Sequence, residues 1–183
     1  MNPFKSTLAA GLCCVAAHSM AADGEINFVG TINASTCSVS VGDMNNNANS
    51  NVSLGNVSSQ SLKKLNDTAG AAAFEIRLQS SGAGDEDCSL SGKTATVRFL
   101  SMNGAAGPNG EWLALDGAGS EGVASNVAIQ IRDAKGNDIQ LGRSSSEYAD
   151  LSVPLRFTAN YIATGLATPG TANAKASFSV DYK

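Results

Sequence analysis

Few side chains in this sequence are suited to catalysis or metal binding. Its 183 residues include one histidine, His18, and four cysteines, Cys13, Cys14, Cys37 and Cys88. His18 and the first two cysteines lie in an N-terminal segment that we expect to be removed, as argued below. The remaining chain has no imidazole for a catalytic triad or a histidine-bound metal, and two cysteines are too few for a structural metal site. Since it also lacks a glycine-rich phosphate loop, we predict no catalytic residue, no metal ligand and no cofactor.

Acidic residues are the remaining candidates for chemistry. A pair of carboxylates in a cleft is enough to hydrolyse glycosides, and Asp85-Glu86-Asp87 provides adjacent acids. These residues lie in a stretch rich in glycine and serine, which favours a solvated acidic turn over a catalytic site. Residues 133–138 lack the ligand spacing and terminal glutamate of a calcium loop, so Lys135-Gly136-Asn137 is predicted to form a hairpin turn. Trp112, the single tryptophan, is predicted to belong to the core and not to a sugar-binding surface.

Residues 1–21 have the features of a secretory signal peptide. Lys5 precedes an apolar run from Leu8 to Ala17, and Ser19-Met20-Ala21 places small residues where signal peptidase needs them. We expect cleavage after Ala21; cleavage after Ala22 is the alternative, but it would put the larger Met20 at one of those positions. No other apolar run approaches the roughly 20 residues needed to cross a bilayer. The mature chain is therefore expected to be exported and not membrane-embedded.

Export and composition narrow the possible functions. Cys37 and Cys88 form an even pair in a chain sent to an oxidising compartment, so a disulfide between them is expected. Closing a loop of that length stabilises a fold by roughly 4 kcal/mol in the chain-entropy model.

Residues 22–183 carry sixteen acidic and eleven basic side chains (the twelve of the full chain less Lys5), a net charge of −5. This acidic balance offers no basic footprint for nucleic acid.

Apolar and polar residues alternate in several short runs, which predicts β-strands with one buried face. Clusters of Gly, Asn, Asp and Ser separate the runs and favour turns. Only Ser58–Lys64 and Ala69–Ala73 hint at helix, and neither holds a helical period for more than one short turn. A single all-β sandwich domain is therefore predicted. The runs are Ile26–Val41, Phe74/Ile76/Leu78, Ala95/Val97/Phe99, Val127/Ile129/Ile131, Val153/Leu155/Phe157/Ala159/Tyr161 and Ala174/Ala176/Phe178/Val180/Tyr182.

Two segments near the ends of the chain carry a resemblance to a known family. The first, residues 24–32, alternates as an ordinary strand does and leads into Cys37. The second starts at Gly170, fourteenth from the C-terminus, and its apolar face ends at the penultimate Tyr182. A strand of the first kind, one cysteine pair and a last strand of this form, in that order, resemble type 1 pilin-like major fimbrial subunits of the chaperone/usher pathway. The resemblance continues through Asn126–Asp133, Ile139–Leu141, Tyr161–Gly165 and Thr168–Gly170.

The resemblance implies an immunoglobulin-like sandwich that lacks its last strand and is completed by donor-strand complementation. The missing strand leaves a groove, which a partner chain fills with a strand of its own. Residues 22–32 are the implied donor segment, ahead of a pilin domain at residues 33–183. The residues of the donor strand are Gly24, Ile26, Phe28, Gly30 and Ile32. The residues of the groove wall, which chaperone and usher are expected to recognise, are Gly170, Ala174, Ala176, Phe178, Val180 and Tyr182.

The resemblance also implies a function and partners. The chain is expected to be a structural subunit of an adhesive fimbria, without enzyme activity, that polymerises head to tail and supports cell adhesion and biofilm formation. Its implied partners are identical or related pilin subunits, a periplasmic chaperone and an outer-membrane usher, on a route through the periplasm to the cell surface. Two alternatives stay open: a minor, adaptor or glycan-binding fimbrial subunit, and a periplasmic sandwich in which residues 24–32 fill the chain's own groove.

Overall fold

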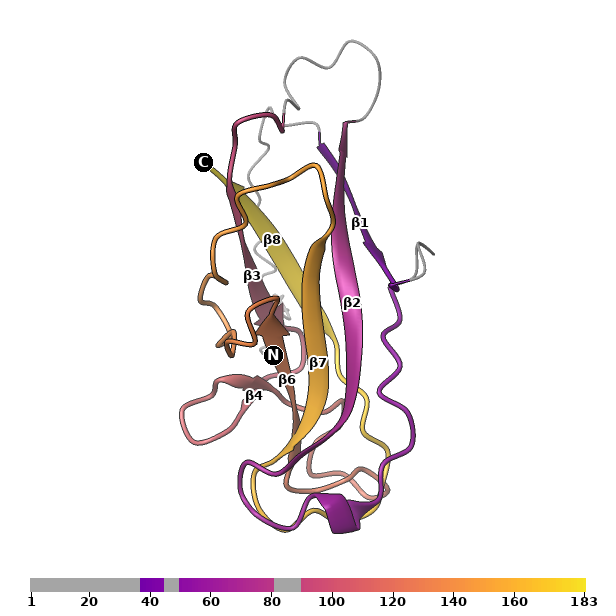
Figure 1. The fold of residues 1–183 in the computed structure, drawn as a ribbon. Helices are drawn as coiled ribbons and strands as arrows, with labels where there is room; N and C mark the ends of the chain where they lie inside the picture. The colour runs from indigo at the N-terminus through magenta and orange to yellow at the C-terminus, as the bar shows by residue number, and fades with distance from the viewer. Residues whose placement is uncertain (1–36, 45–49, 81–89) are drawn as a thin grey trace, which may run out of the picture. The chain divides into compact units, whose positions relative to one another are not determined.

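The computed structural model describes residues 37–44, 50–80 and 90–183, and these belong to one compact unit, Asn33–Lys183. The described part is built from β-strands (Figure 1), as the alternating pattern predicts. One 3-10 turn, η1 at Ser59–Ser61, is the only helical element within these ranges. The strands are β1 Cys37–Gly42, β2 Thr68–Ser80, β3 Ala95–Ser101, β4 Ala105–Ala106, β5 Trp112–Leu113, β6 Val127–Asp133, β7 Leu155–Ala163 and β8 Ala176–Tyr182.

The strands form two antiparallel sheets. Six of them make one sheet in the order β1-β2-β7-β6-β5-β4, and β3 pairs with β8 in a second, two-stranded sheet. The register places Phe74 of β2 opposite Phe157 of β7, and Phe99 of β3 opposite Phe178 of β8. Each sheet therefore presents aromatic side chains to the other, which is the arrangement of a sandwich.

An aromatic cluster joins the two sheets. Phe74 stacks on Phe157 with ring centroids 5.4 Å apart, and Phe99 meets Phe157 edge to face at 5.3 Å. These are the favoured geometries for aromatic pairs. Phe157 is 1% exposed, whereas Phe178, whose ring lies 6.2 Å from Phe99, is half-buried. The cluster is thus closed at its centre and partly open on the β8 side.

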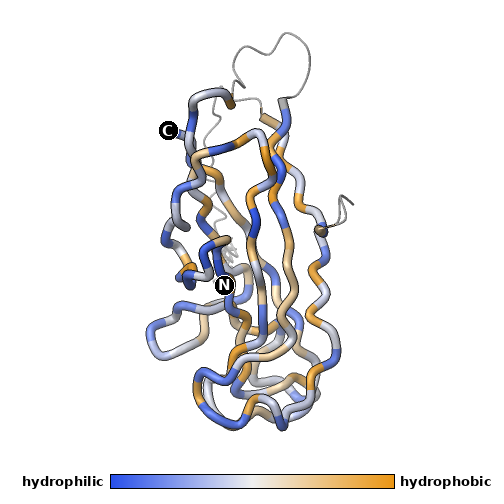
Figure 2. The backbone as a smooth tube through the Cα atoms, viewed as in Figure 1, coloured by the Kyte–Doolittle hydropathy of each residue, from blue (hydrophilic) through white to orange (hydrophobic). Residues whose placement is uncertain are grey.

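The alternating pattern identifies the inward faces of most strands, and Figure 2 shows apolar and hydrophilic residues alternating along them. Two expectations were wrong. Val153 was expected to begin a strand face, but β7 starts at Leu155 and Val153 is 53% exposed, because the intervening Pro154 has no N–H to give to the ladder. Ala69–Ala73 was expected to form at most a helical turn, but it belongs to β2, because pairing with β7 overrides the helix propensity of alanine.

A bulge in β2 brings a distant segment close to the sheet. The register with β7 shifts between Ala69 and Ala72, and Gly70 there has a φ of 68°. A Cβ on Gly70 would lie 2.7 Å from the carbonyl oxygen of Leu54 and 2.8 Å from a methyl carbon of Val57. The missing side chain therefore gives residues 54–57 the space to pass over β2.

Replacing Gly70 with alanine is expected to destabilise the protein by more than about 2 kcal/mol, since the new methyl group clashes with backbone and the left-handed conformation itself costs about 1 kcal/mol. Gly55→Ala is the matched control: its φ is 70°, but nothing lies within 4 Å of the added Cβ. Urea unfolding midpoints of both variants measure the difference. Equal losses of stability would show that the close approach of residues 54–57 is unimportant.

Residues 142–148 cover the outer edge of β3. The backbone N–H of Gly142 donates to the carbonyl of Phe99, and that of Ser145 donates to the carbonyl of Val97, both at 2.8 Å. Isolated bridges join the same two segments at further positions. The edge of β3 that faces away from β8 is therefore already occupied by the chain itself.

A buried carboxylate holds this cover in place. Asp133, 4% exposed, accepts from the backbone N–H groups of Lys135 and Asn137, both at 2.9 Å, and from the hydroxyl of Ser146 at 2.5 Å. Burial by itself raises the pKa of Asp133, but the hydrogen bonds from these three residues outweigh it and hold the pKa below its ordinary 3.8. The N–H of Gly136 also donates to the carbonyl of Asp133, which confirms the predicted hairpin turn.

Asp133→Asn is expected to cost about 1 to 3 kcal/mol at neutral pH, because an amide nitrogen replaces an oxygen that accepts hydrogen bonds. A lowered pKa means that the folded protein binds this proton less readily than the unfolded chain does. The stability contributed by Asp133 is therefore present above about pH 4 and lost as the pH falls through the lowered pKa. Urea unfolding at neutral pH and at about pH 3 tests this: the variant should lose less stability on acidification than the unaltered protein. An identical pH dependence would contradict it.

Candidate functional site

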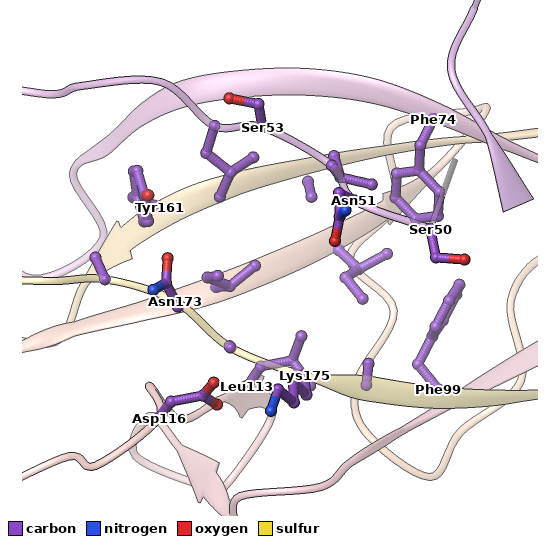
Figure 3. A pocket seen from close by; sticks show the side chains of 18 of the residues that line it. Ser50, Asn51, Ser53, Phe74, Phe99, Leu113, Asp116, Tyr161, Asn173 and Lys175 are labelled. Carbon is purple, nitrogen blue, oxygen red and sulfur yellow. The ribbon is translucent and has the colours of Figure 1, made fainter. Parts of the chain in front are cut away.

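A groove of about 1050 Å³ runs along β8 (Figure 3). Residues 50–56 form one wall, and residues 172–176 with Phe178 form the other. The floor between the walls consists of side chains from both sheets, most of which are core residues. The groove is therefore an opening into the hydrophobic core and not a depression in a polar surface. The remaining lining residues are Val41, Phe74, Phe99, Leu113, Asp116, Ile129, Ile131, Ala159 and Tyr161.

Polar side chains lie along the two walls, and aromatic rings lie at the two ends. In Figure 3, Phe74 and Phe99 lie toward one end and Tyr161 toward the other. Burial raises the pKa of Tyr161, so its hydroxyl is neutral at physiological pH. An occupant with one apolar face and polar edges would match this distribution.

One edge of β8 has no partner in the part of the chain that the structure describes. Thr94 and Lys183 exchange N–H···O bonds of 3.0 and 2.9 Å, and the N–H of Met102 donates to the carbonyl of Lys175 at 3.1 Å. Odd-numbered residues of this strand thus direct their backbone groups toward β3. The even-numbered residues from Ala174 to Tyr182 direct theirs toward the groove, where no described strand pairs with them. The groove therefore offers a ladder of backbone donors and acceptors beside an apolar floor.

The opposite wall has the same alternation as a strand. Val52 and Leu54 are half-buried and pack against the core, whereas Ser53 and Gly55 are exposed. The segment is extended along the groove, yet it belongs to neither sheet. The two walls are therefore both strand-like, and a space lies between them.

Two charged residues line the groove, both on the β8 side. The backbone N–H of Asp116 donates to the carbonyl of Asn173 at 2.7 Å, and its carboxylate accepts from the side-chain amide of Asn103. Lys175 is exposed and forms no ion pair with any residue that the structure describes. The carboxylate of Asp116 is thus oriented by a hydrogen bond and keeps its negative charge, while no described acidic side chain pairs with Lys175.

Five of the six residues predicted for the groove wall lie on one face. Ala174, Ala176 and Phe178 line the groove, and Val180 and Tyr182 continue the face as half-buried side chains that pack against the core. The sixth, Gly170, lies outside the groove lining. A Cβ on Gly170 would be 2.3 Å from the backbone nitrogen of Ala124. Its small size lets the chain leading to β8 pack directly on that backbone.

Other predicted residues lie outside the described residues. These are the donor residues Gly24, Ile26, Phe28, Gly30 and Ile32, the signal peptide at residues 1–21, and Cys88. Cys37, at the start of β1, takes part in a disulfide; its pairing with Cys88 stays a prediction.

Sequence reasoning missed the second wall and the two charges. Val52 and Leu54 give a two-residue alternation, which is too short to separate from the polar stretch around it. Asp116 and Lys175 are 59 positions apart in the sequence (175 less 116), and only the fold brings both to one rim. No local sequence pattern could have indicated that these two residues line the same groove.

The other candidates for chemistry contribute no site in the described ranges. Asp85-Glu86-Asp87 lies outside them. Trp112 is 5% exposed, packs against Ala128 and Ile162 and donates its indole N–H to Asp138 at 3.1 Å, which confirms the predicted core position. Among described side chains, no group of three or more His, Cys, Asp or Glu residues could hold a metal ion. No described helix has the length and hydropathy to span a membrane.

Comparisons with known proteins agree with this geometry. Residues 26–183 match the family model "Fimbrial protein". The chain is 36% identical to a fimbrial subunit type 1 of Klebsiella pneumoniae over 166 residues, covering 87% of this chain and 84% of the relative. It is 34% identical to a type-1 fimbrial protein A chain of Escherichia coli over 165 residues, covering 87% and 83%.

Solved structures show the same fold. An antigen and type I fimbria protein of Burkholderia pseudomallei superposes with a TM-score of 0.52 at 28% identity, covering 78% of this chain and 95% of that one. The P pilus rod subunit PapA gives a TM-score of 0.50 at 19% identity, covering 87% and 99%. The sandwich described above is therefore the immunoglobulin-like fold of chaperone-usher pilins. Because the family model spans residues 26–183 and relatives above 30% identity align along most of their length, this chain belongs to the fimbrial protein family and is a structural subunit of a cell-surface fimbrium.

Proposed function

We propose that the subunits polymerise head to tail by donor-strand exchange, each inserting residues 22–32 into the groove of the next. The observation that carries the proposal is the groove itself, in which an edge of β8 that pairs with no described strand lies beside an apolar floor. A strand placed there would pair with the outward backbone groups of Ala174 to Tyr182. Strand addition to a free sheet edge is an established mode of recognition, with pilins among its known examples.

The donor segment suits this groove by its alternation. Ile26, Phe28 and Ile32 share one face and would rest on floor residues such as Phe99 and Ile131. Each large apolar side chain so buried contributes roughly 1.5 to 3 kcal/mol. Together with a row of backbone hydrogen bonds, these contributions make release of the strand slow. Repetition of one head-to-tail contact that does not close gives a filament.

Delivery to the fibre would follow from export. In this proposal the signal peptide at residues 1–21 is removed, Cys37 pairs with Cys88, and a periplasmic chaperone lends a strand to the groove until an outer-membrane usher exchanges it for the next subunit's donor segment. The chain then acts as a building block without enzyme activity, and the fibre supports cell adhesion and biofilm formation. A groove that no described segment fills would need a chaperone, because an exposed apolar opening and an unpaired strand edge promote aggregation.

The test is size analysis of the protein after periplasmic expression with and without its cognate chaperone, followed by electron microscopy of cells. We expect a one-to-one chaperone complex, and fibres that disappear when residues 22–32 are deleted. A stable monomer that forms without a chaperone would instead mean that the groove is filled from within. Fibres that persist after the deletion would exclude residues 22–32 as the donor segment.

A further inference from the structure

Among the described residues that line the groove, Lys175 is a cation without an ion-pair partner, and the proposed donor segment has acidic side chains but no basic one. Lys175 is exposed on the β8 wall and has no ion-pair partner among described residues. The other charged lining residue, Asp116, is engaged by Asn103. Residues 22–32 contain Asp23 and Glu25 and no basic side chain. The described rim therefore carries one negative and one positive charge, and the positive one, on Lys175, is the one that can attract the acidic side chains of the donor segment.

The direction of the donor strand follows from the course of β1 and β8. In Figure 1, β1 starts at the end of the domain where β8 finishes, and the two strands run in opposite directions. A donor segment that extends straight out from the start of β1 enters a neighbour in the same orientation from the neighbour's opposite end. It therefore runs antiparallel to the neighbour's β8.

Side-chain size then limits the register. The wall offers small residues at Ala172, Ala174 and Ala176, and the bulky Phe178 follows. Large donor side chains fit opposite the alanines, and glycine fits opposite the phenylalanine. This places Gly24 opposite Phe178, with Ile26 opposite Ala176 and Phe28 opposite Ala174.

This register brings an acidic residue next to the free lysine. Residues directly opposite point to the same face, so Asn27 lies opposite Lys175 on the outer face and Glu25 is its diagonal neighbour. Diagonal neighbours are within reach of long side chains. A shift of two residues toward Gly170 would place Glu25 directly opposite Lys175, and a shift the other way would force Ile26 against Phe178. Placing Gly30 opposite Phe178 instead would set Phe28 against Val180 and Ile26 against Tyr182, so that bulky side chains would meet. In the two registers that place Ile26 and Phe28 opposite alanines, Glu25 is therefore near Lys175.

We propose that Lys175 is a specificity-determining residue of the groove, which favours donor segments with an acidic side chain at the position of Glu25. The inference rests on the donor-strand function proposed above. Its occupant is residues 22–32 of a second copy of this chain. Because the pair lies at the rim, it acts on selection and rate of insertion more than on the strength of the finished fibre.

The test uses the mature chain carrying Phe28→Asp, which disables its own donor segment, purified as a complex with its chaperone, and a synthetic peptide of residues 22–32 with a fluorescent label. Peptide capture is measured by anisotropy. Lys175→Glu is expected to weaken capture by about three- to tenfold, and a Glu25→Lys peptide is expected to be captured better by Lys175→Glu than by the unaltered groove. The difference should shrink between about 0.05 M and 0.5 M salt, since exposed charges are screened. Lys64→Glu, an equal charge change at an exposed residue outside the groove lining, should leave capture unchanged.

Each outcome has a separate meaning. Failure of the unaltered groove to capture the unaltered peptide would overturn the donor-strand function itself. Capture that is equal with Lys175 and with Glu at that position would overturn only the specificity inference. Capture of the Glu25→Lys peptide by the unaltered groove repeats the test without changing the folded subunit. If this peptide is captured as well as the unaltered one, the specificity inference is also overturned.

Discussion

Replacing Ile26 or Phe28 with aspartate is expected to abolish fibres while leaving a subunit that folds with its chaperone. In the proposed donor strand both positions belong to the apolar face, so the new carboxylate would have to enter a groove floored by core residues such as Phe74 and Phe99. Burying an unpaired carboxylate costs several kcal/mol, and the burial of a large apolar side chain, roughly 1.5 to 3 kcal/mol, is lost as well. Electron microscopy of cells measures the fibres, and size analysis of the periplasmic fraction measures the chaperone complex.

Thr31→Asp is the matched control for this prediction. It adds the same charge to the same segment, but in the proposed donor strand residue 31 would lie on the alternate face and stay in solvent. Fibres should therefore persist. Normal fibres from Ile26→Asp or Phe28→Asp would refute the donor role of these residues, and loss of the chaperone complex would indicate a folding defect instead.

Phe157→Ala is expected to destabilise the subunit by about 3 to 5 kcal/mol, enough to deplete it from the periplasm. The ring is 1% exposed and contacts the rings of Phe74 and Phe99 at centroid distances of 5.4 and 5.3 Å. Its removal leaves a cavity between the two sheets and takes away the contacts that hold them together. Urea unfolding of the purified subunit gives the loss of free energy, and immunoblots of periplasmic extracts give the loss of protein.

The control for this core substitution is Leu166→Ala. Leu166 is 66% exposed, so its truncation should change the free energy of unfolding by no more than about 0.5 kcal/mol. If the two variants were equally stable, the aromatic cluster would not be the contact that joins the sheets.

The strands themselves could largely be predicted from the sequence, because a half-buried strand leaves a two-residue alternation that is visible without any partner. Ile76, Val97 and Ile131 were assigned to inward faces in this way, and all three are buried. The hairpin turn around Gly136 was also predictable, since its residue types suit a tight turn. The face of β8 that lines the groove was identified by the same alternation.

The pairing of strands and the second wall of the groove could not be predicted, because they depend on contacts between distant residues. Residues 50–56 line the groove, and residues 54–57 pass over β2 in the space that Gly70 leaves; nothing near residue 52 in the sequence indicates this. Val153 continues the apolar alternation of β7, yet Pro154 keeps it out of the ladder. Asp116 and Lys175 lie at the same rim only because the fold brings together segments that are far apart in the sequence.

The cover that residues 142–148 form over β3 limits the number of donor strands that the β3–β8 sheet could accept. A two-stranded sheet has two edges, and a subunit with both edges free could accept two donor strands while supplying one. Such a trivalent unit would produce branched networks. Because the hydrogen bonds from Gly142 and Ser145 close the β3 edge, this sheet keeps one edge that could accept a strand, and the donor segment proposed above would supply one strand. In the proposed polymer a subunit with one donor strand and one acceptor edge in this sheet extends a linear chain, and the short cover over β3 would thereby favour an unbranched fibre.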